Sequence, residues 1–164
     1  MNNHDSEEID LKPVDYYNRA VNYMENGKLE LAIANYTKAI ELDPVQESFY
    51  VNRSIAYMHM GEYKYAIDDC TAALKINQNC VDAYINRSGN YLAIAEHDNA
   101  IKDCNKAISI DPTNINAYGN RAVIYEDMGE YDKARKDYLF ALTIDPNNSK
   151  LQFNLEDLEK NIAK

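Results

Sequence analysis

The dipeptide Asn-Arg occurs four times in the chain, and each copy begins 34 residues after the previous one. The copies are Asn18-Arg19, Asn52-Arg53, Asn86-Arg87 and Asn120-Arg121. Tyrosines and alanines return on the same 34-residue grid. A fixed period of this length indicates stacked structural repeats, because one such unit cannot bury its apolar face alone. The register predicts four copies, at residues 13–46, 47–80, 81–114 and 115–148.

Each copy contains two amphipathic helical patterns separated by a short break. In the second copy, apolar residues recur at helical spacing over residues 50–58 and again over residues 65–76. A glycine marks the break in three copies, and glycine commonly ends a helix in the left-handed conformation. The three breaks are Gly27-Lys28, Gly61-Glu62 and Gly129-Glu130. Each copy is therefore expected to form a helix, a turn and a second helix.

Two copies depart from this pattern at their turns. Ala95 replaces the glycine in the third copy, which predicts a less regular turn there at modest cost. Three copies end in Asp-Pro, a pair that stops one helix and begins the next, but the second copy has Gln78 in place of the proline. The link between copies two and three is therefore expected to be more continuously helical.

Composition limits the partners and the compartment. The formal net charge of −10 disfavours nucleic acid and anionic membrane surfaces, both of which require a basic face. The first twelve residues, 1–12, form an acidic N-terminal tail rather than a secretory signal, and no apolar run is long enough to span a bilayer. We expect one cytoplasmic domain.

Three cysteines and three histidines give little support for a metal site. Cys70 and Cys104 occupy the same position in successive copies, so they are either a redox or metal pair or two small buried residues. The second interpretation is favoured, because Cys80 stands alone and the histidines are scattered, without zinc-site spacing. We expect no metal and no cofactor.

The repeat resembles a known family. The pattern resembles the tetratricopeptide repeat (TPR). It has a large aromatic residue early in the first helix, a tyrosine seven residues later, two regularly spaced alanines and a terminal proline. Here the repeat is a Tyr-x-Asn-Arg variant, with Tyr in place of the usual Trp. The resemblance implies an all-α, right-handed α-solenoid of four helix-turn-helix repeats. It further implies a C-terminal capping helix at residues 149–164, whose apolar stripe consists of Leu151, Leu155, Leu158 and Ile162. Phe153 lies off that stripe, so it either packs on the fourth repeat or contacts a partner.

In this family the first helices line a concave groove, which assigns the asparagines to a ligand-facing column. Their amides can pair with both the N–H and the C=O of an extended peptide. The alternative is that these asparagines close the geometry between helices or remain from duplication. The predicted groove residues are Asn18, Asn52, Asn86 and Asn120, with the apolar neighbours Tyr17, Val51, Ile85, Val21, Ile55 and Val123. Leu92 and Glu126 follow one turn later.

The arginine of each pair points elsewhere. It is rotated about 100° from its asparagine, toward the packed side of the helix. Second helices carry an aspartate at the matching position in three copies, at Asp69, Asp103 and Asp137, whereas the first copy has Asn35. Arg-to-Asp ion pairs at the repeat junctions explain this spacing without a ligand.

One known TPR binding mode fits the sequence poorly. TPR co-chaperones that hold the acidic C-terminus of heat-shock chaperones use Lys, Arg and Asn at five positions, which correspond here to Tyr17, Val21, Asn52, Asp82 and Asn86. Only Asn52 fits, and Asp82 would repel an acidic tail. Shifting the comparison by one repeat again finds no cation, at Val51, Ile55, Asn86, Asn116 and Asn120.

No catalytic constellation is evident, so the chain is predicted not to be an enzyme. We expect a protein-binding scaffold, more often monomeric than oligomeric, that holds an extended, partly apolar peptide or a partner helix of unknown identity. Acidic surface outside the groove would favour a basic partner. The alternatives are a self-assembling structural subunit, or a chaperone accessory protein without the carboxylate clamp.

Overall fold

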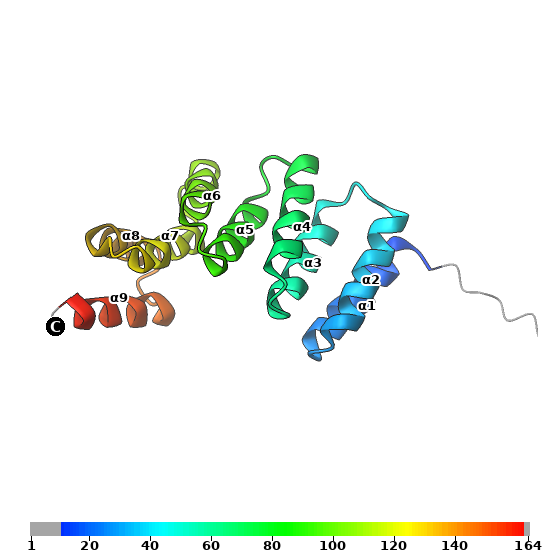
Figure 1. Ribbon diagram of the computed structural model, residues 1–164, viewed down its shortest axis with the longest axis horizontal. Helices are drawn as coiled ribbons and strands as arrows, with labels where there is room; N and C mark the ends of the chain where they lie inside the picture. Colours follow the sequence, from blue (N-terminus) through cyan, green and yellow to red (C-terminus); the bar gives the residue numbers. More distant parts are fainter. Residues whose placement is uncertain (1–10, 163–164) are drawn as a thin grey trace, which may run out of the picture.

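The computed structural model describes residues 11–162, which form nine α-helices and no strand. Residues 1–10, which make up most of the predicted acidic tail, and residues 163–164 lie outside the described part. Consecutive helices pair and the pairs stack in chain order into an elongated array, so the expected all-α solenoid is confirmed (Figure 1). The helices are α1 (Pro13–Glu25), α2 (Leu29–Leu42), α3 (Glu47–His59), α4 (Tyr63–Ile76), α5 (Val81–Ala93), α6 (His97–Ile110), α7 (Ile115–Asp127), α8 (Tyr131–Ile144) and α9 (Ser149–Ile162).

Within residues 11–162, none of these helices combines the length and the apolar character needed to cross a membrane.

The turn inside each repeat has the same left-handed geometry in all four copies. Gly27, Gly61 and Gly129 have φ of 68°, 76° and 75°, and Ala95 takes the same conformation with φ of 59°. The N–H of Glu96 donates to the carbonyl of Tyr91 at 2.8 Å, the same bond that closes the other turns. The expectation of a less regular turn in the third copy is therefore wrong. The third turn differs from the others in its energy rather than its geometry, because alanine is strained in the left-handed conformation and glycine is not.

The link between the second and third repeats also keeps the common form. α4 ends at Ile76 and α5 begins at Val81, so four residues separate them, as at the other links. The Oδ1 atom of Asn77 accepts the N–H of Asn79 at 3.0 Å, as Asp111 accepts that of Thr113 at 3.0 Å. The expectation of a continuously helical link is wrong, because this side-chain turn ends the helix without a proline.

The core is packed in one way in the first and fourth repeats and in another way in the two middle repeats. Tyr36 and Tyr138 are buried opposite alanines, Ala20 and Ala122, in the first and fourth repeats. The middle repeats instead pair a buried cysteine with a serine, and the thiol of Cys70 donates to the hydroxyl of Ser54 at 3.3 Å. A large residue thus faces a small one, or two residues of intermediate size face each other, as close packing requires.

The thiols of Cys70 and Cys104, in the two middle repeats, are unreactive. Burial raises the pKa of the Cys70 and Cys104 thiols to about 11, so both stay protonated at neutral pH. In the described part of the chain, no group of three or more His, Cys, Asp or Glu residues is placed to hold a metal ion. The cysteines are therefore packing residues.

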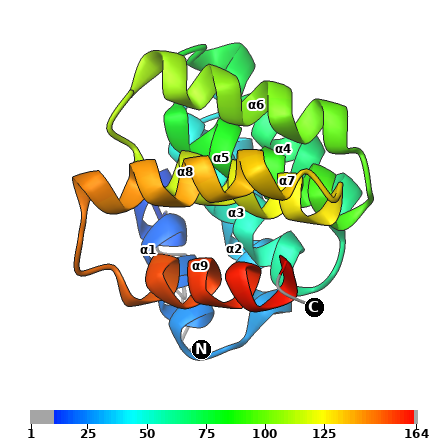
Figure 2. The same cartoon turned by 90° about the vertical axis from the view of Figure 1, so that its left-hand side faces the viewer.

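Helix α9 covers the end of the fourth repeat, where it lies beside α8 (Figure 2). Leu151 and Leu158 are buried in a cluster with Tyr118 and Tyr138. A Cβ atom on Gly119 would lie 3.2 Å from a methyl group of Leu151, so glycine at this position lets α9 approach α7 closely. Phe153 is 67% exposed. Its packing on the fourth repeat, one of the two interpretations from sequence, is therefore wrong.

The turns give a reciprocal stability prediction. Ala95→Gly is expected to raise the free energy of unfolding by about 1 kcal/mol, because it removes the left-handed strain of alanine. Gly61→Ala, the reverse change in the neighbouring repeat, is expected to lower it by a similar amount. Thermal and urea unfolding monitored by circular dichroism measure both. Ala93→Gly, at the exposed end of α5, is the control and should be destabilising; a loss of stability in Ala95→Gly would contradict the account.

Candidate functional site

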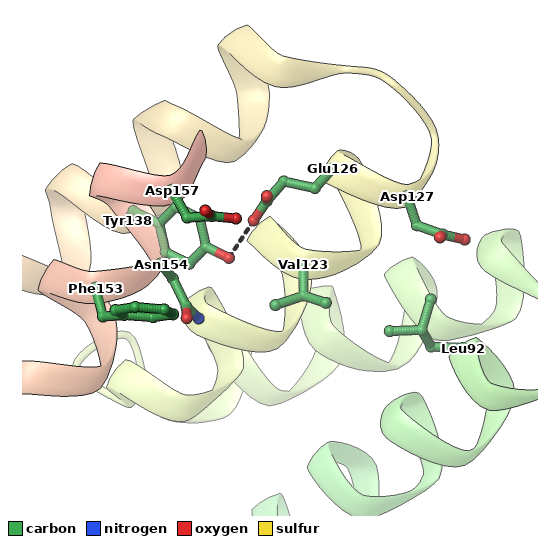
Figure 3. Close-up of a pocket in the computed structure, with 8 residues that line it drawn as sticks. All are labelled: Leu92, Val123, Glu126, Asp127, Tyr138, Phe153, Asn154 and Asp157. Carbon is green, nitrogen blue, oxygen red and sulfur yellow. Dashed lines mark hydrogen bonds between the residues drawn. The ribbon is translucent and has the colours of Figure 1, made fainter. Parts of the chain in front are cut away.

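A hollow that involves predicted groove residues lies near the C-terminal end of the array. It encloses about 510 Å³ between α5, α7, α8 and α9 (Figure 3). A second hollow of about 210 Å³ adjoins it between α7 and α9 and shares Val123 and Asn154. The larger one is lined by Leu92, Val123, Glu126, Asp127, Tyr138, Phe153, Asn154 and Asp157, and the smaller one includes Gly119, Asn120 and Leu151.

The larger hollow is acidic and partly apolar. Three carboxylates, those of Glu126, Asp127 and Asp157, line it, and its lining contains no lysine or arginine. The exposed ring of Phe153 and the side chain of Val123, which is 37% exposed, add apolar surface. Such a site suits a side chain with an apolar stem and a cationic end, because the stem packs while the head meets the carboxylates.

All three carboxylates have partners within the protein, and Oδ2 of Asp157 accepts a hydrogen bond from Nδ2 of Asn161 at 3.3 Å. The buried hydroxyl of Tyr138 donates a hydrogen bond to Oε1 of Glu126 (Figure 3). Burial, and then this bond to Glu126, raise the pKa of the Tyr138 phenol, so it remains a donor at neutral pH. Nε2 of His97 lies 2.6 Å from Oδ2 of Asp127. Tyr138 therefore fixes the direction of Glu126.

The asparagine column is divided between structure and surface. Asn52 donates through Nδ2 to the carbonyl of Ser48 at 2.8 Å and to the hydroxyl of Tyr17 at 3.3 Å. Asn120 donates to the carbonyl of Ile85 at 3.2 Å. Both thus tie their helix to the preceding first helix, as the alternative interpretation of the column expects.

The remaining two asparagines are less committed. Asn18 is exposed and Asn86 is half-buried. Within residues 11–162, the side-chain amide of neither residue makes a hydrogen bond. These two amides are the members of the column that remain available to a ligand.

The predicted apolar groove residues also separate into two groups. Val51 is buried in a cluster with Leu74 and Ala83, and Tyr17 stacks on Phe49 with ring centroids 5.2 Å apart. Three are half-buried, at Val21, Ile55 and Ile85, and Val123 alone of the set is both exposed and part of the acidic hollow.

Sequence reasoning did not place Tyr138, Asn154 and Asp157 in a site. They belong to a second helix and to the capping helix, and helical phase within the first helices gives no signal for them. The unexplained position of Phe153 off the α9 stripe was the one available indication.

The arginine column joins repeats together, which confirms the predicted ion pairs. Arg87 donates from Nε and Nη2 to both carboxylate oxygens of Asp103 at 2.7 and 2.8 Å, and from Nη1 to the hydroxyl of Thr71 in the preceding repeat at 2.9 Å. Its guanidinium lies between the rings of Tyr84 and Tyr91. The same fork recurs in Arg53 with Asp69 and in Arg121 with Asp137.

Comparison with family models identifies the repeat. Two models of the tetratricopeptide repeat match the chain, one at residues 14–44 and 115–148 and the other at residues 47–80 and 81–114. Because these matches cover most of the sequence, the chain belongs to the tetratricopeptide repeat family. The fold is that of a protein-interaction scaffold. The comparison with curated proteins gives no match.

Solved structures agree with this assignment. The first TPR domain of Spaghetti (RPAP3), bound to the HSP90 peptide SRMEEVD, is 26% identical, with a TM-score of 0.70 over 72% of this chain and 94% of that one. A thermophilic TPR protein of Thermus thermophilus is 20% identical, with a TM-score of 0.82 over 92% and 83%. A TPR protein of Parabacteroides merdae is 21% identical, with a TM-score of 0.85 over 97% of this chain and 62% of that one.

The junction arginines give a second prediction. Arg87→Met is expected to lower the free energy of unfolding by about 3 kcal/mol, because Asp103 is left buried without its partner. The double variant Arg87→Met/Asp103→Leu should recover much of the loss. Urea unfolding measures all three proteins. Arg19→Met, in the first repeat, is the matched control and should change stability by less than about 0.5 kcal/mol. Reduced peptide binding by Arg87→Met at unchanged stability would contradict a structural role.

Proposed function

We propose that this protein is a non-catalytic scaffold that binds an extended peptide or a partner helix along the face formed by its first helices. The observation that carries the proposal is the acidic hollow beside Asn120, which is lined by three carboxylates and the exposed ring of Phe153. Its shape and chemistry suit one basic side chain of a partner next to an apolar one. We further propose a cytoplasmic location, which the protonated, unpaired thiols support.

Asn18 and Asn86 contribute backbone recognition in this proposal. Each amide offers two donors and one acceptor, so it can bind both polar groups of an extended peptide unit regardless of sequence. At about 0.5–1.5 kcal/mol net for each hydrogen bond, two such residues strengthen binding without selecting a sequence. Selectivity then comes from the acidic hollow.

The charge of the groove separates this protein from its peptide-bound neighbour. The peptide SRMEEVD in the Spaghetti (RPAP3) structure carries three acidic side chains. Helices α1, α3, α5 and α7 contain no lysine, and their arginines are those of the four Asn-Arg pairs. Three of these arginines are held by aspartates. The similarity supports peptide binding, while the charge supports a basic rather than an acidic sequence at the C-terminal end.

A second candidate function is self-assembly through α9. Phe153 is the most exposed of the large apolar side chains in residues 11–162, and aromatic residues of this kind often anchor protein interfaces. Light scattering over a range of concentrations, with wild type and Phe153→Ser, tests it. A concentration-dependent mass that Phe153→Ser abolishes would support assembly, and a strict monomer would remove it.

The peptide proposal predicts distinct effects from the two parts of the site. In a peptide-array screen, the double variant Glu126→Gln/Asp157→Asn is expected to weaken peptides that combine Lys or Arg with an apolar residue about tenfold, because charge-assisted contacts are lost. The double variant Asn18→Ala/Asn86→Ala should weaken all bound peptides similarly, because it removes contacts to the backbone.

The control for this screen is Glu156→Gln, an exposed acidic residue on α9 outside the hollow. It should leave binding unchanged, and thermal unfolding should confirm that every variant is folded. Equal binding by wild type and the Glu126→Gln/Asp157→Asn protein would sink the assignment of the acidic hollow. Equal binding by the asparagine variant would remove the amide column.

A further inference from the structure

The N-terminal end of the array contains another polar hollow, whose only charged lining residue is an arginine. It encloses about 510 Å³ and is lined by Asn18, Arg19, Asn22, Tyr23 and Asn35, four polar residues and one cation, without a carboxylate. It lies on α1 and α2, at the opposite end of the array from α9 (Figure 1). In a chain of net charge −10, an exposed arginine among amides is unusual.

The other three repeats show what this arginine position binds. In each of them, Nε and Nη2 hold both oxygens of one aspartate at 2.7–2.8 Å, and Nη1 reaches a side-chain oxygen of the preceding repeat. These arginines are largely buried. The position is thus a carboxylate-binding position three times over.

The first repeat has the arginine but neither of its partners. Asn35 stands where the other repeats have aspartate, and its Nδ2 atom donates to the carbonyl of Leu31 at 2.8 Å. Among residues 11–162, Arg19 also makes no contact that corresponds to the third one, with a side-chain oxygen of another repeat. Arg19 is exposed, and among residues 11–162 no carboxylate lies within ion-pair distance of it.

We propose that Arg19, together with the Asn35 and Asn18 amides, forms a carboxylate-binding site that takes an aspartate or glutamate side chain of an acidic polypeptide segment. The incoming carboxylate takes the place of the aspartate that the other repeats carry, and the bidentate guanidinium fork and the adjacent amide N–H groups donate hydrogen bonds to it. The site is separate from the acidic hollow at the other end and shares only Asn18 with the proposed groove, so the test depends on Arg19, which has no role in the proposed groove function. Two sources of the carboxylate exist: another polypeptide, or the acidic residues Asp5, Glu7, Glu8 and Asp10 of this chain.

The test uses a fluorescently labelled synthetic peptide with the sequence of residues 1–10 as an acidic probe. Binding is measured by fluorescence polarisation at low salt against two full-length proteins. One is wild type, and the other carries Asn or Gln in place of Asp5, Glu7, Glu8 and Asp10. The control probe has the same sequence with every Asp and Glu changed to its amide. Binding confined to the acidic probe is expected to fall as salt rises.

Two substitutions decide the assignment. Arg19→Met is expected to weaken binding at least tenfold, because charge-assisted hydrogen bonds are lost. Asn35→Asp supplies an internal carboxylate, so it should occupy Arg19, weaken the probe to the same extent and raise Tm by about 2 °C. The control is Lys28→Met, which removes an exposed cation from the same repeat as Arg19 and should leave binding unchanged.

Each outcome bears on the proposal. Binding that Arg19→Met and Asn35→Asp both abolish supports it. Equal affinity for the two full-length proteins then identifies an open site for another polypeptide, whereas binding only by the neutralised-tail protein identifies the chain's own acidic residues as the occupant. Failure of both proteins to bind the acidic probe, or binding that survives Arg19→Met, overturns it. None of these results depends on whether the acidic hollow binds a basic peptide.

Discussion

An arginine in each of the last three repeats joins three helices at once, and the stacking of the array depends on it. Arg53 on α3 holds Asp69 on α4 and Thr37 on α2, so one side chain fixes both the helix pair of its own repeat and the junction to the repeat before it. The tyrosines above and below cover the guanidinium and exclude water from the ion pair. In this setting the pairing sets the register of the repeats, because a shift of either helix would leave a buried charge without its partner.

This internal bonding explains why the asparagine column is only partly available. Two of the amides find partners on the preceding first helix, because Asn52 donates to the hydroxyl of Tyr17 and Asn120 to the carbonyl of Ile85. Asn18 is exposed, and its side chain makes no hydrogen bond within residues 11–162. Four residues that are identical in sequence therefore differ in chemistry, according to what stands next to each of them in the stack.

The repeat period, the helix pairs and the Arg-to-Asp pairing follow from the sequence because each depends on local spacing within one 34-residue unit. The failures have a common cause as well. Ala95 and Gln78 were expected to change the turn and the link that contain them, but a backbone hydrogen bond from Glu96 to Tyr91 and the Asn77 side chain give both segments the common geometry. The acidic hollow was missed because α9 completes it, and the angle at which α9 packs depends on the contact between Gly119 and Leu151 rather than on any repeated pattern.

The two ends of the array differ from its interior for a physical reason. Inside the stack, each repeat provides hydrogen-bond partners for polar groups of its neighbour. The junction arginines, the buried serines and two of the four asparagines of the column are therefore already bonded within the protein. At the N-terminal end the arginine is exposed and has no ion-pair partner among residues 11–162, and at the C-terminal end α9 adds Asp157 and the ring of Phe153 to the Glu126 and Asp127 carboxylates of the fourth repeat. The two charged sites that we propose therefore lie at the ends of the described array, with a cation at one and carboxylates at the other.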